Sequence, residues 1–424
     1  MKIKTKNLPL DEVLDLKKPP YKKPVKPSKI LTSLAALIGK KDLKETNFKC
    51  DIDLGDALDK PSLILMNHSS FIDLEICETI FKNKPFNIVC TSDGFVGKYA
   101  LMRRLGCIPT RKFVTDLSLI RDIKYCLKTL GTSVLMYPEA SYTFDGTATP
   151  LPERIGVLIK ALGVPVIMVK TRGAFLRDPL YNMLQKRAVN VSASARCIVS
   201  YDEIKSLSAE QITSRIESEF VFDGFAEQLE DGVLITEPFR ADGLHRILYK
   251  CPSCLCEEKT EGKGTRLICR NCGKEWELNE NGSLSAIGSE TRFSHIPDWY
   301  KWEREEVRSD IESGNYKMAC DVDVGIMVDY NSIYFVGSGK LSHGMDGFVL
   351  DGCDGKLHYE QSPLACYSLY SDYFWYELGD VICIGDCDYL YYCFPKNRNI
   401  VAKTRLAAEE LYKYKKRETR KQNG

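Results

Sequence analysis

The sequence pattern best suited to chemistry is the pair His68 and Asp73, five residues apart in the segment Asn67–Asp73 (NHSSFID). An apolar run precedes His68 and a helical pattern follows it, which predicts a turn between a strand and a helix. From that helix the Asp73 carboxylate can reach back to the imidazole and fix its tautomer, so the other ring nitrogen can accept a hydroxyl proton. On spacing alone, a loop histidine beside a helix-capping carboxylate is the simpler interpretation.

Three later segments favour the chemical interpretation, because together with Asn67–Asp73 they form an ordered set of four motifs. They are Leu105–Lys112 (LGCIPTRK), Val134–Thr143 (VLMYPEASYT) and Gly163–Val169 (GVPVIMV). In order and separation, the four segments resemble the motif blocks of the glycerolipid acyltransferases, the 1-acylglycerol-3-phosphate (lysophosphatidic acid) acyltransferase family. The resemblance covers roughly residues 60–200, less than half of the chain.

The resemblance implies an O-acyltransferase of phospholipid synthesis. Such an enzyme moves a fatty acyl group from acyl-CoA or acyl carrier protein to a lysophospholipid hydroxyl, with 1-acylglycerol 3-phosphate as the leading acceptor. His68 would be the general base and Asp73 would stabilise the imidazolium. No covalent acyl-enzyme is required, because the thioester already has a good leaving group. Backbone amides after His68 could hold the oxyanion.

The resemblance also implies a site for the acceptor phosphate, and here the sequence departs from the family pattern. In the second block, Lys112 is the position-for-position match to the family's basic residue. In the third block, Tyr142 replaces an arginine, so one guanidinium suited to phosphate is missing. Arg154 or Arg172 could substitute for it, and a different lysolipid or glycolipid acceptor is an alternative. The predicted phosphate-binding residues are Arg111, Lys112, Glu139 and Arg154.

Two cysteine pairs predict a metal site. Cys251 and Cys254 form one CxxC pair, Cys269 and Cys272 form the second, and 14 residues separate the pairs. This pattern is typical of a tetrahedral structural Zn²⁺ site in a zinc ribbon. Four thiolates leave no open coordination position, so the metal is expected to stabilise the fold. Cys256 is a possible competing ligand at a spacing that fits less well.

Short apolar runs alternate with helical patterns over residues 60–235, which predicts an α/β sheet flanked by helices. Strands are expected at Ser62–Met66, Asn87–Cys90, Ser133–Tyr137 and Pro165–Lys170. Helices are expected at Phe71–Phe81, Leu117–Leu130, Arg154–Leu162 and Ala209–Glu230.

The region after the cysteines predicts a β-rich accessory domain. Short β-rich runs follow a helix at Trp299–Ser313, and a helix at Val401–Lys413 closes the region. Residues 291–412 carry a net charge of −9 and many aromatic side chains, which suits a module for a protein partner. The expected domains are 1–45 (basic arm and short amphipathic helix), 46–240 (acyltransferase domain), 241–290 (zinc ribbon) and 291–424 (acidic aromatic domain with terminal helix and basic tail).

The formal net charge of +1 conceals two basic ends: residues 1–29 carry +6, residues 413–424 carry +5, and the rest sums to −10. The basic, proline-rich arm is expected to be extended. It precedes a short amphipathic helix, which fits either a membrane surface or the protein's own core. No run approaches the ~20 apolar residues of a bilayer span. The apolar residues on one face of the short amphipathic helix are Ile30, Leu31, Leu34, Leu37 and Ile38.

Together these features predict a cytoplasmic protein, peripheral to the inner face of the membrane. No secretory signal is visible, and 17 cysteines scattered among apolar residues do not suit a disulfide framework. A non-catalytic lipid-binding scaffold is the alternative from another functional class. No nucleic acid partner is expected, because the ribbon lacks an Arg-rich aromatic face.

Overall fold

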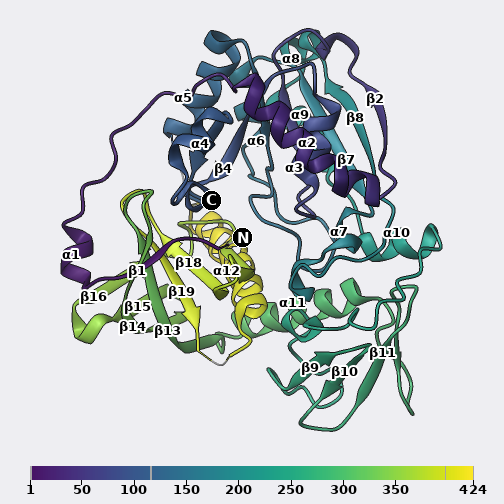
Figure 1. Cartoon of the computed structure of the whole chain (residues 1–424). Coiled ribbons are helices and arrows are strands. Elements are labelled where there is room, and N and C mark those ends of the chain that lie inside the picture. Colours follow the sequence, from purple (N-terminus) through teal and green to yellow (C-terminus); the bar gives the residue numbers. More distant parts are fainter. Residues whose placement is uncertain (1, 115–116, 397, 424) are drawn as a thin grey trace. The chain divides into compact units, whose positions relative to one another are not determined.

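The computed structural model describes residues 2–114, 117–396 and 398–423 (Figure 1). The chain forms two compact units. Residues 20–178 and 186–227 make up the first, here the α/β unit. The second unit combines residues 1–19, 179–185 and 228–424.

The α/β unit is built on a seven-stranded sheet with the order β2-β8-β7-β3-β6-β4-β5. Neighbouring strands are parallel except for β7 and β8. In β3 every residue is completely buried, as expected for a central strand covered on both faces. The strands are β2 (Lys49–Asp53), β3 (Leu63–Met66), β4 (Phe86–Thr91), β5 (Cys107–Thr110), β6 (Ser133–Met136), β7 (Val166–Arg172) and β8 (Ser192–Val199).

Helices accompany this sheet, and the predicted α/β class is confirmed. They are α2 (Lys29–Glu45), α3 (Asp73–Ile80), α4 (Tyr99–Arg104), α5 (Leu117–Tyr125), α6 (Ile155–Leu162), α7 (Ala174–Arg177), α8 (Tyr201–Ser206), α9 (Ala209–Glu219) and α10 (Gly224–Glu230). One hydrophobic cluster joins side chains of β3, β6 and β7 to side chains of α5, α6 and α9.

The single helix expected over Ala209–Glu230 is wrong, because the structure divides it into α9 and α10. The Asp223 carboxylate accepts hydrogen bonds from the amides of Phe225 (3.1 Å) and Ala226 (2.9 Å). An aspartate that binds the first amides of a helix acts as its N-cap, so a new helix begins there.

The second unit contains two sheets, which are antiparallel except where β1 (Thr5–Asn7) pairs in parallel with β14. The smaller has the order β12-β11-β10-β9; Cys269 is the last residue of β10, and Cys272 lies in the turn that follows. Its strands are β9 (Thr260–Lys263), β10 (Arg266–Cys269), β11 (Glu275–Leu278) and β12 (Leu284–Ala286). The larger has the order β16-β15-β14-β13-β19-β18-β17. Its strands are β13 (Lys317–Met327), β14 (Ile333–Gly344), β15 (Gly347–Gly352), β16 (Leu357–Gln361), β17 (Tyr370–Trp375), β18 (Gly379–Gly385) and β19 (Leu390–Pro395).

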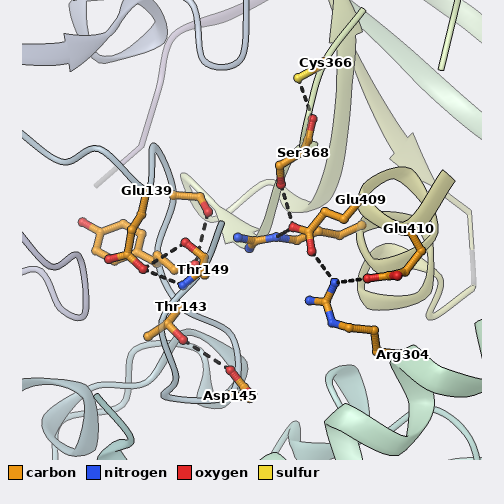
Figure 2. A network of polar contacts seen from close by, with 12 residues as sticks. Glu139, Thr143, Asp145, Thr149, Arg304, Cys366, Ser368, Glu409 and Glu410 are labelled. Carbon is orange, nitrogen blue, oxygen red and sulfur yellow. Dashed lines mark hydrogen bonds and ion pairs between the residues drawn. The ribbon is translucent and has the colours of Figure 1, made fainter. Parts of the chain in front are cut away.

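Two helices of the second unit pack together through ion pairs. Arg304 of α11 (Ile296–Glu312) contacts Glu409 at 2.6 Å and Glu410 at 3.1 Å on α12 (Val401–Asn423) (Figure 2). Glu409 and Glu410 are buried, so the arginine charge compensates two carboxylates removed from water. The closing helix is confirmed, and it extends through most of the basic tail.

The N-terminal arm is more ordered than expected. Strand β1 (Thr5–Asn7) pairs in parallel with the start of β14, and helix α1 (Leu10–Leu14) follows. Leu10 and Val13 are buried, which anchors the arm to the second unit. Sequence analysis missed this helix because its apolar pattern is only two residues, Leu10 and Val13 at i and i+3, within a segment rich in lysine and proline.

Helix α2 is also longer than its apolar pattern predicted. It packs on α3 where Gly39 lies against Glu75, and Leu43 is buried on the same side. No helix in the described part of the chain combines the length and apolar character needed to cross a membrane.

Candidate functional site

The predicted site residues follow the carboxyl ends of parallel strands in the α/β unit. His68 follows β3, Glu139 follows β6 and Lys112 follows β5. Strands β3 and β6 are hydrogen-bonded neighbours. Because the carboxyl ends of parallel strands meet at one edge of the sheet, this is where such folds place ligands.

His68 and Asp73 are in direct contact. The imidazole Nδ1 lies 3.0 Å from Asp73 Oδ2, and Asp73 is only 1% exposed at the start of α3. Among the described residues, no hydrogen bond occupies the second imidazole nitrogen, Nε2, of His68. The side chain of His68 is 16% exposed, so a substrate hydroxyl has a route to this nitrogen.

Burial sets the protonation of the pair. It holds the pKa of His68 well below its usual range, and the positive charge of Lys112 adds to this effect. The imidazole is therefore neutral near pH 7, the form that can accept a proton. Burial also raises the pKa of Asp73 to about 7, although the amides of Ser69 and Ser70 oppose that shift.

The amides that follow His68 hold Asp73. Ser69 N and Ser70 N donate to Asp73 Oδ2 over 2.9 Å and 3.1 Å. These two amides are therefore already engaged, and the expectation that amides after His68 hold an oxyanion stays a prediction. They fix the carboxylate that orients the imidazole.

Glu139 joins two loops at the same edge of the sheet. Its Oε2 accepts the His68 amide over 3.2 Å. Its Oε1 accepts the amide and hydroxyl of Thr149 over 2.7 Å and 2.9 Å (Figure 2). Glu139 is 1% exposed. These contacts give it a positioning role, and its part in phosphate binding stays a prediction.

We expect Glu139→Ala to lower the free energy of unfolding by about 1–3 kcal/mol, because the substitution leaves donors of His68 and Thr149 without their acceptor. Urea unfolding measures this. The matched variant Thr149→Val removes one hydroxyl donor and should cost about 1 kcal/mol or less. A Glu139→Ala protein as stable as wild type would contradict the role.

The predicted cationic residues lie in different surroundings. Arg111 and Lys112 are half-buried, and the charge of Lys112 acts on His68. Arg154 is exposed at the residue before α6. Arg172 lies at the end of β7 with its Nη1 4.0 Å from Glu227 Oε1. Because the charge of Lys112 acts on the histidine, Lys112 is the strongest of these candidates.

Two tyrosines enclose the imidazole. The ring centroid of His68 lies 4.0 Å from that of Tyr137 and 3.8 Å from that of Tyr142, with interplanar angles of 23° and 28°. Sequence reasoning noted Tyr142 only as a missing arginine and gave Tyr137 no role. A strand end followed by Pro-Glu gives no signal that both rings stack on a histidine in another loop.

A buried cluster of charged residues contacts the His68 loop through Ser70. Sequence reasoning missed this cluster. Asp178 accepts a hydrogen bond from the Ser70 hydroxyl and pairs with Arg177 at 2.7 Å. Arg177 also contacts Asp42 of α2 at 2.8 Å. Asp178 and Arg177 are each only 3% exposed. The cluster ties the loop to a neighbouring helix through paired charges.

The four paired cysteines converge in the second unit. Their sulfur atoms all lie within 4.8 Å of one another, with Cys251 to Cys272 at 3.8 Å and Cys254 to Cys269 at 3.7 Å. A tetrahedral Zn²⁺ with bonds of about 2.3 Å requires S–S edges of about 3.8 Å. The four thiols therefore fit such a metal.

Both cysteine turns have the same backbone geometry. The amide four residues after the first cysteine of each pair donates back to that cysteine: Leu255 to Cys251 (2.9 Å) and Gly273 to Cys269 (2.8 Å). Leu255 and Gly273 adopt positive φ angles of 60° and 74°. Cys256 lies outside the cluster of four, so nothing supports it as a competing ligand.

The chain is similar in structure to one known enzyme over part of its length. No family model matches the chain, and no curated protein matches it. Among solved structures, the chain is similar to the 1-acyl-sn-glycerophosphate (LPA) acyltransferase PlsC from Thermotoga maritima. The alignment has a TM-score of 0.35 and 16% sequence identity, and it covers 45% of this chain and 76% of that chain.

Proposed function

We propose that the α/β unit is an O-acyltransferase of phospholipid synthesis that transfers a fatty acyl group from a thioester to a lysophospholipid hydroxyl. The acceptor that fits best is 1-acylglycerol 3-phosphate. One observation carries the proposal: a neutral His68 has Nδ1 on buried Asp73 and Nε2 free of hydrogen bonds among the described residues. This is the arrangement of a general base for a hydroxyl.

The reaction needs one proton acceptor and no cofactor chemistry. Nε2 of His68 takes the proton as the hydroxyl oxygen attacks the thioester carbonyl, and the tetrahedral intermediate then collapses with cleavage of the C–S bond. The proton passes from His68 to the leaving sulfur, which gives an ester and a free thiol. The Asp73 carboxylate stabilises the imidazolium between these steps. Acyl-CoA and acyl carrier protein both supply such a thioester.

Lys112 is the candidate for the acceptor phosphate, with Arg111 beside it. An ammonium or guanidinium near the base would hold an anionic headgroup while the hydroxyl reaches Nε2. Tyr142 favours a second candidate acceptor, a lysolipid or glycolipid without a terminal phosphate, because the family's arginine is absent from this position.

An acceptor panel tests the proposal and separates these candidates. Purified protein is given a labelled acyl-CoA, or acyl carrier protein, with 1-acylglycerol 3-phosphate, lysophosphatidylcholine, lysophosphatidylglycerol or a monoglycosyl lipid. We expect the fastest transfer to the phosphate monoester. Fastest transfer to a lipid without that group would select the second candidate, and no transfer to any acceptor would contradict the enzyme.

We further propose that helix α2 lies on the inner face of the membrane and makes the protein peripheral. One face of α2 carries the exposed residues Ile30 (81%), Leu34 (51%), Leu37 (60%) and Ile38 (71%). Lys40 and Lys41 follow this face, and such lysines suit anionic headgroups.

We expect the double substitution Ile30→Ser and Ile38→Ser to weaken binding to anionic vesicles at least tenfold, because each buried isoleucine contributes about 1.5–3 kcal/mol. Sedimentation with vesicles of phosphatidylglycerol and phosphatidylethanolamine measures this. Val221→Ser removes an equally exposed apolar side chain (70%) outside α2 and serves as the control. Equal vesicle binding by the double variant would contradict the proposal.

For the second unit we propose a structural Zn²⁺ held by Cys251, Cys254, Cys269 and Cys272, and a role in binding a protein partner. The sulfur distances and the paired turns support the metal. The net charge of −9 over residues 291–412 supports a protein partner over an anionic lipid or a nucleic acid.

A further inference from the structure

The aromatic rings around His68 form a continuous stack. Tyr137 and Tyr142 each stack within about 4 Å of the imidazole centre, at 4.0 Å and 3.8 Å, so the two rings must cover opposite faces. Phe71 stacks on Tyr142 in turn, with centroids 5.3 Å apart and planes at 21°. The order is therefore Tyr137, His68, Tyr142, Phe71.

This stack changes the energy of the histidine when it gains a proton. The face of an aromatic ring carries negative electrostatic potential, which attracts a cation and interacts weakly with a neutral ring. His68 is neutral before the reaction and is an imidazolium only after it takes the hydroxyl proton. An interaction that strengthens at that moment lowers the barrier rather than merely binding the substrate.

The charged groups near His68 have opposing effects on the imidazolium. Asp73 contacts Nδ1 and attracts the imidazolium, whereas Lys112 repels it. Glu139 accepts a hydrogen bond from the backbone amide of His68. Since burial removes water from the imidazole, the two tyrosine faces replace part of the lost solvation.

We propose that Tyr137 and Tyr142 stabilise the imidazolium of His68 by cation–π contacts on both faces, and that Tyr142 is a positioning residue that sets the strength of this base. The catalytic consequence rests on the proposed function. An arginine at residue 142 would bring a like charge towards the imidazolium, whereas the tyrosine ring attracts it. Tyr142 therefore gives the base a second aromatic face.

The test varies the negative electrostatic potential on the face of the ring at residue 142 and keeps the shape of the ring nearly constant. Tyr142 is replaced by phenylalanine and then by 4-fluoro-, 3,5-difluoro- and pentafluorophenylalanine, since each fluorine weakens the attraction for a cation. NMR titration of labelled histidine, assigned with His68→Gln, gives the pKa of His68 in each folded protein. We expect Tyr142→Phe to match wild type and the pKa to fall stepwise by about 0.5–1 unit across the series.

The same fluorinated series at Phe71 is the matched control, because this ring contacts Tyr142 and not His68 in the stack. We expect no trend there. A flat pKa across the Tyr142 series, or a His68 that stays neutral in all variants throughout the folded range, would overturn the inference. A purely structural role for the ring predicts that flat result, because shape is constant.

The second part of the test measures the acyl-transfer kinetics of the same Tyr142 variants. With the acceptor chosen by the panel, kcat should fall about 3–10-fold across the Tyr142 series with KM unchanged, in step with the pKa. The two proposals fail differently. A wild-type protein without transfer contradicts the proposed function while the pKa trend still tests the stack, and an active series with constant kcat contradicts only the stack.

Discussion

His68→Ala is expected to lower kcat by about 10²–10⁴-fold, because the variant lacks the group that takes the hydroxyl proton. The effect on KM should be small, since the proposed acceptor contacts are on Lys112 and its neighbours. His68→Gln keeps a side chain between Tyr137 and Tyr142 and should lose activity to a similar extent. Initial rates at saturating thioester measure both. A variant that keeps more than a tenth of wild-type kcat would contradict the role of His68.

The pH dependence follows from Asp73. Its carboxylate must be ionised to stabilise the imidazolium, and its pKa is raised to about 7 by burial. We therefore expect the wild-type rate to rise with pH through about 7. Asp73→Asn, which does not titrate, should lose this rise together with most of the activity.

Stability distinguishes this loss from unfolding. The folded pKa of Asp73 lies above its ordinary value of 3.8, so its stabilising contribution is complete below that value and is lost as pH rises through about 7. Asparagine avoids the cost of burying a charge. The free energy of unfolding of Asp73→Asn at pH 8, relative to wild type, should therefore change far less than its activity.

Loss of zinc is expected to unfold the small sheet of the second unit. We expect one Zn²⁺ per chain, and zinc-finger peptides gain about 10–16 kcal/mol from such a metal. This is comparable to the whole stability of a domain, about 5–15 kcal/mol. Cys269→Ser removes a buried ligand at the end of β10 and should abolish stoichiometric zinc and the hydrogen-exchange protection of β9–β12.

Cys256→Ser is the control for the zinc prediction, since Cys256 is close in sequence and lies outside the four-sulfur cluster. Metal analysis of the two purified variants should give zinc in Cys256→Ser and little in Cys269→Ser. Stoichiometric zinc in Cys269→Ser, or its loss in Cys256→Ser, would require a different ligand set.

The sheet of the α/β unit was predictable because buried parallel strands appear as continuous apolar runs. Met66 ends one such run, and the turn after it necessarily placed His68 at the carboxyl edge, within reach of the first turn of α3. The break between α9 and α10 was not predictable from periodicity. It depends on the local hydrogen bonds of Asp223.

Contacts between distant segments account for the other omissions. Asp178 follows Ser70 by more than a hundred residues, and nothing in either segment indicates that they form a buried hydrogen bond. The stack on His68 requires Tyr137 and Tyr142 to reach it from the loop that follows β6. The cysteine cluster, by contrast, was predictable from the sequence, because the spacing of the two CxxC pairs is typical of one tetrahedral metal site.

The most direct test of the account is the transfer of a labelled acyl group from the thioester to 1-acylglycerol 3-phosphate, with wild type and His68→Ala side by side. Circular dichroism and zinc content show that both proteins are folded. The account predicts labelled diacyl product and one free thiol per ester for wild type, with a loss of at least a hundredfold in the variant. Equal rates in the two proteins, or thiol release without ester, would contradict it.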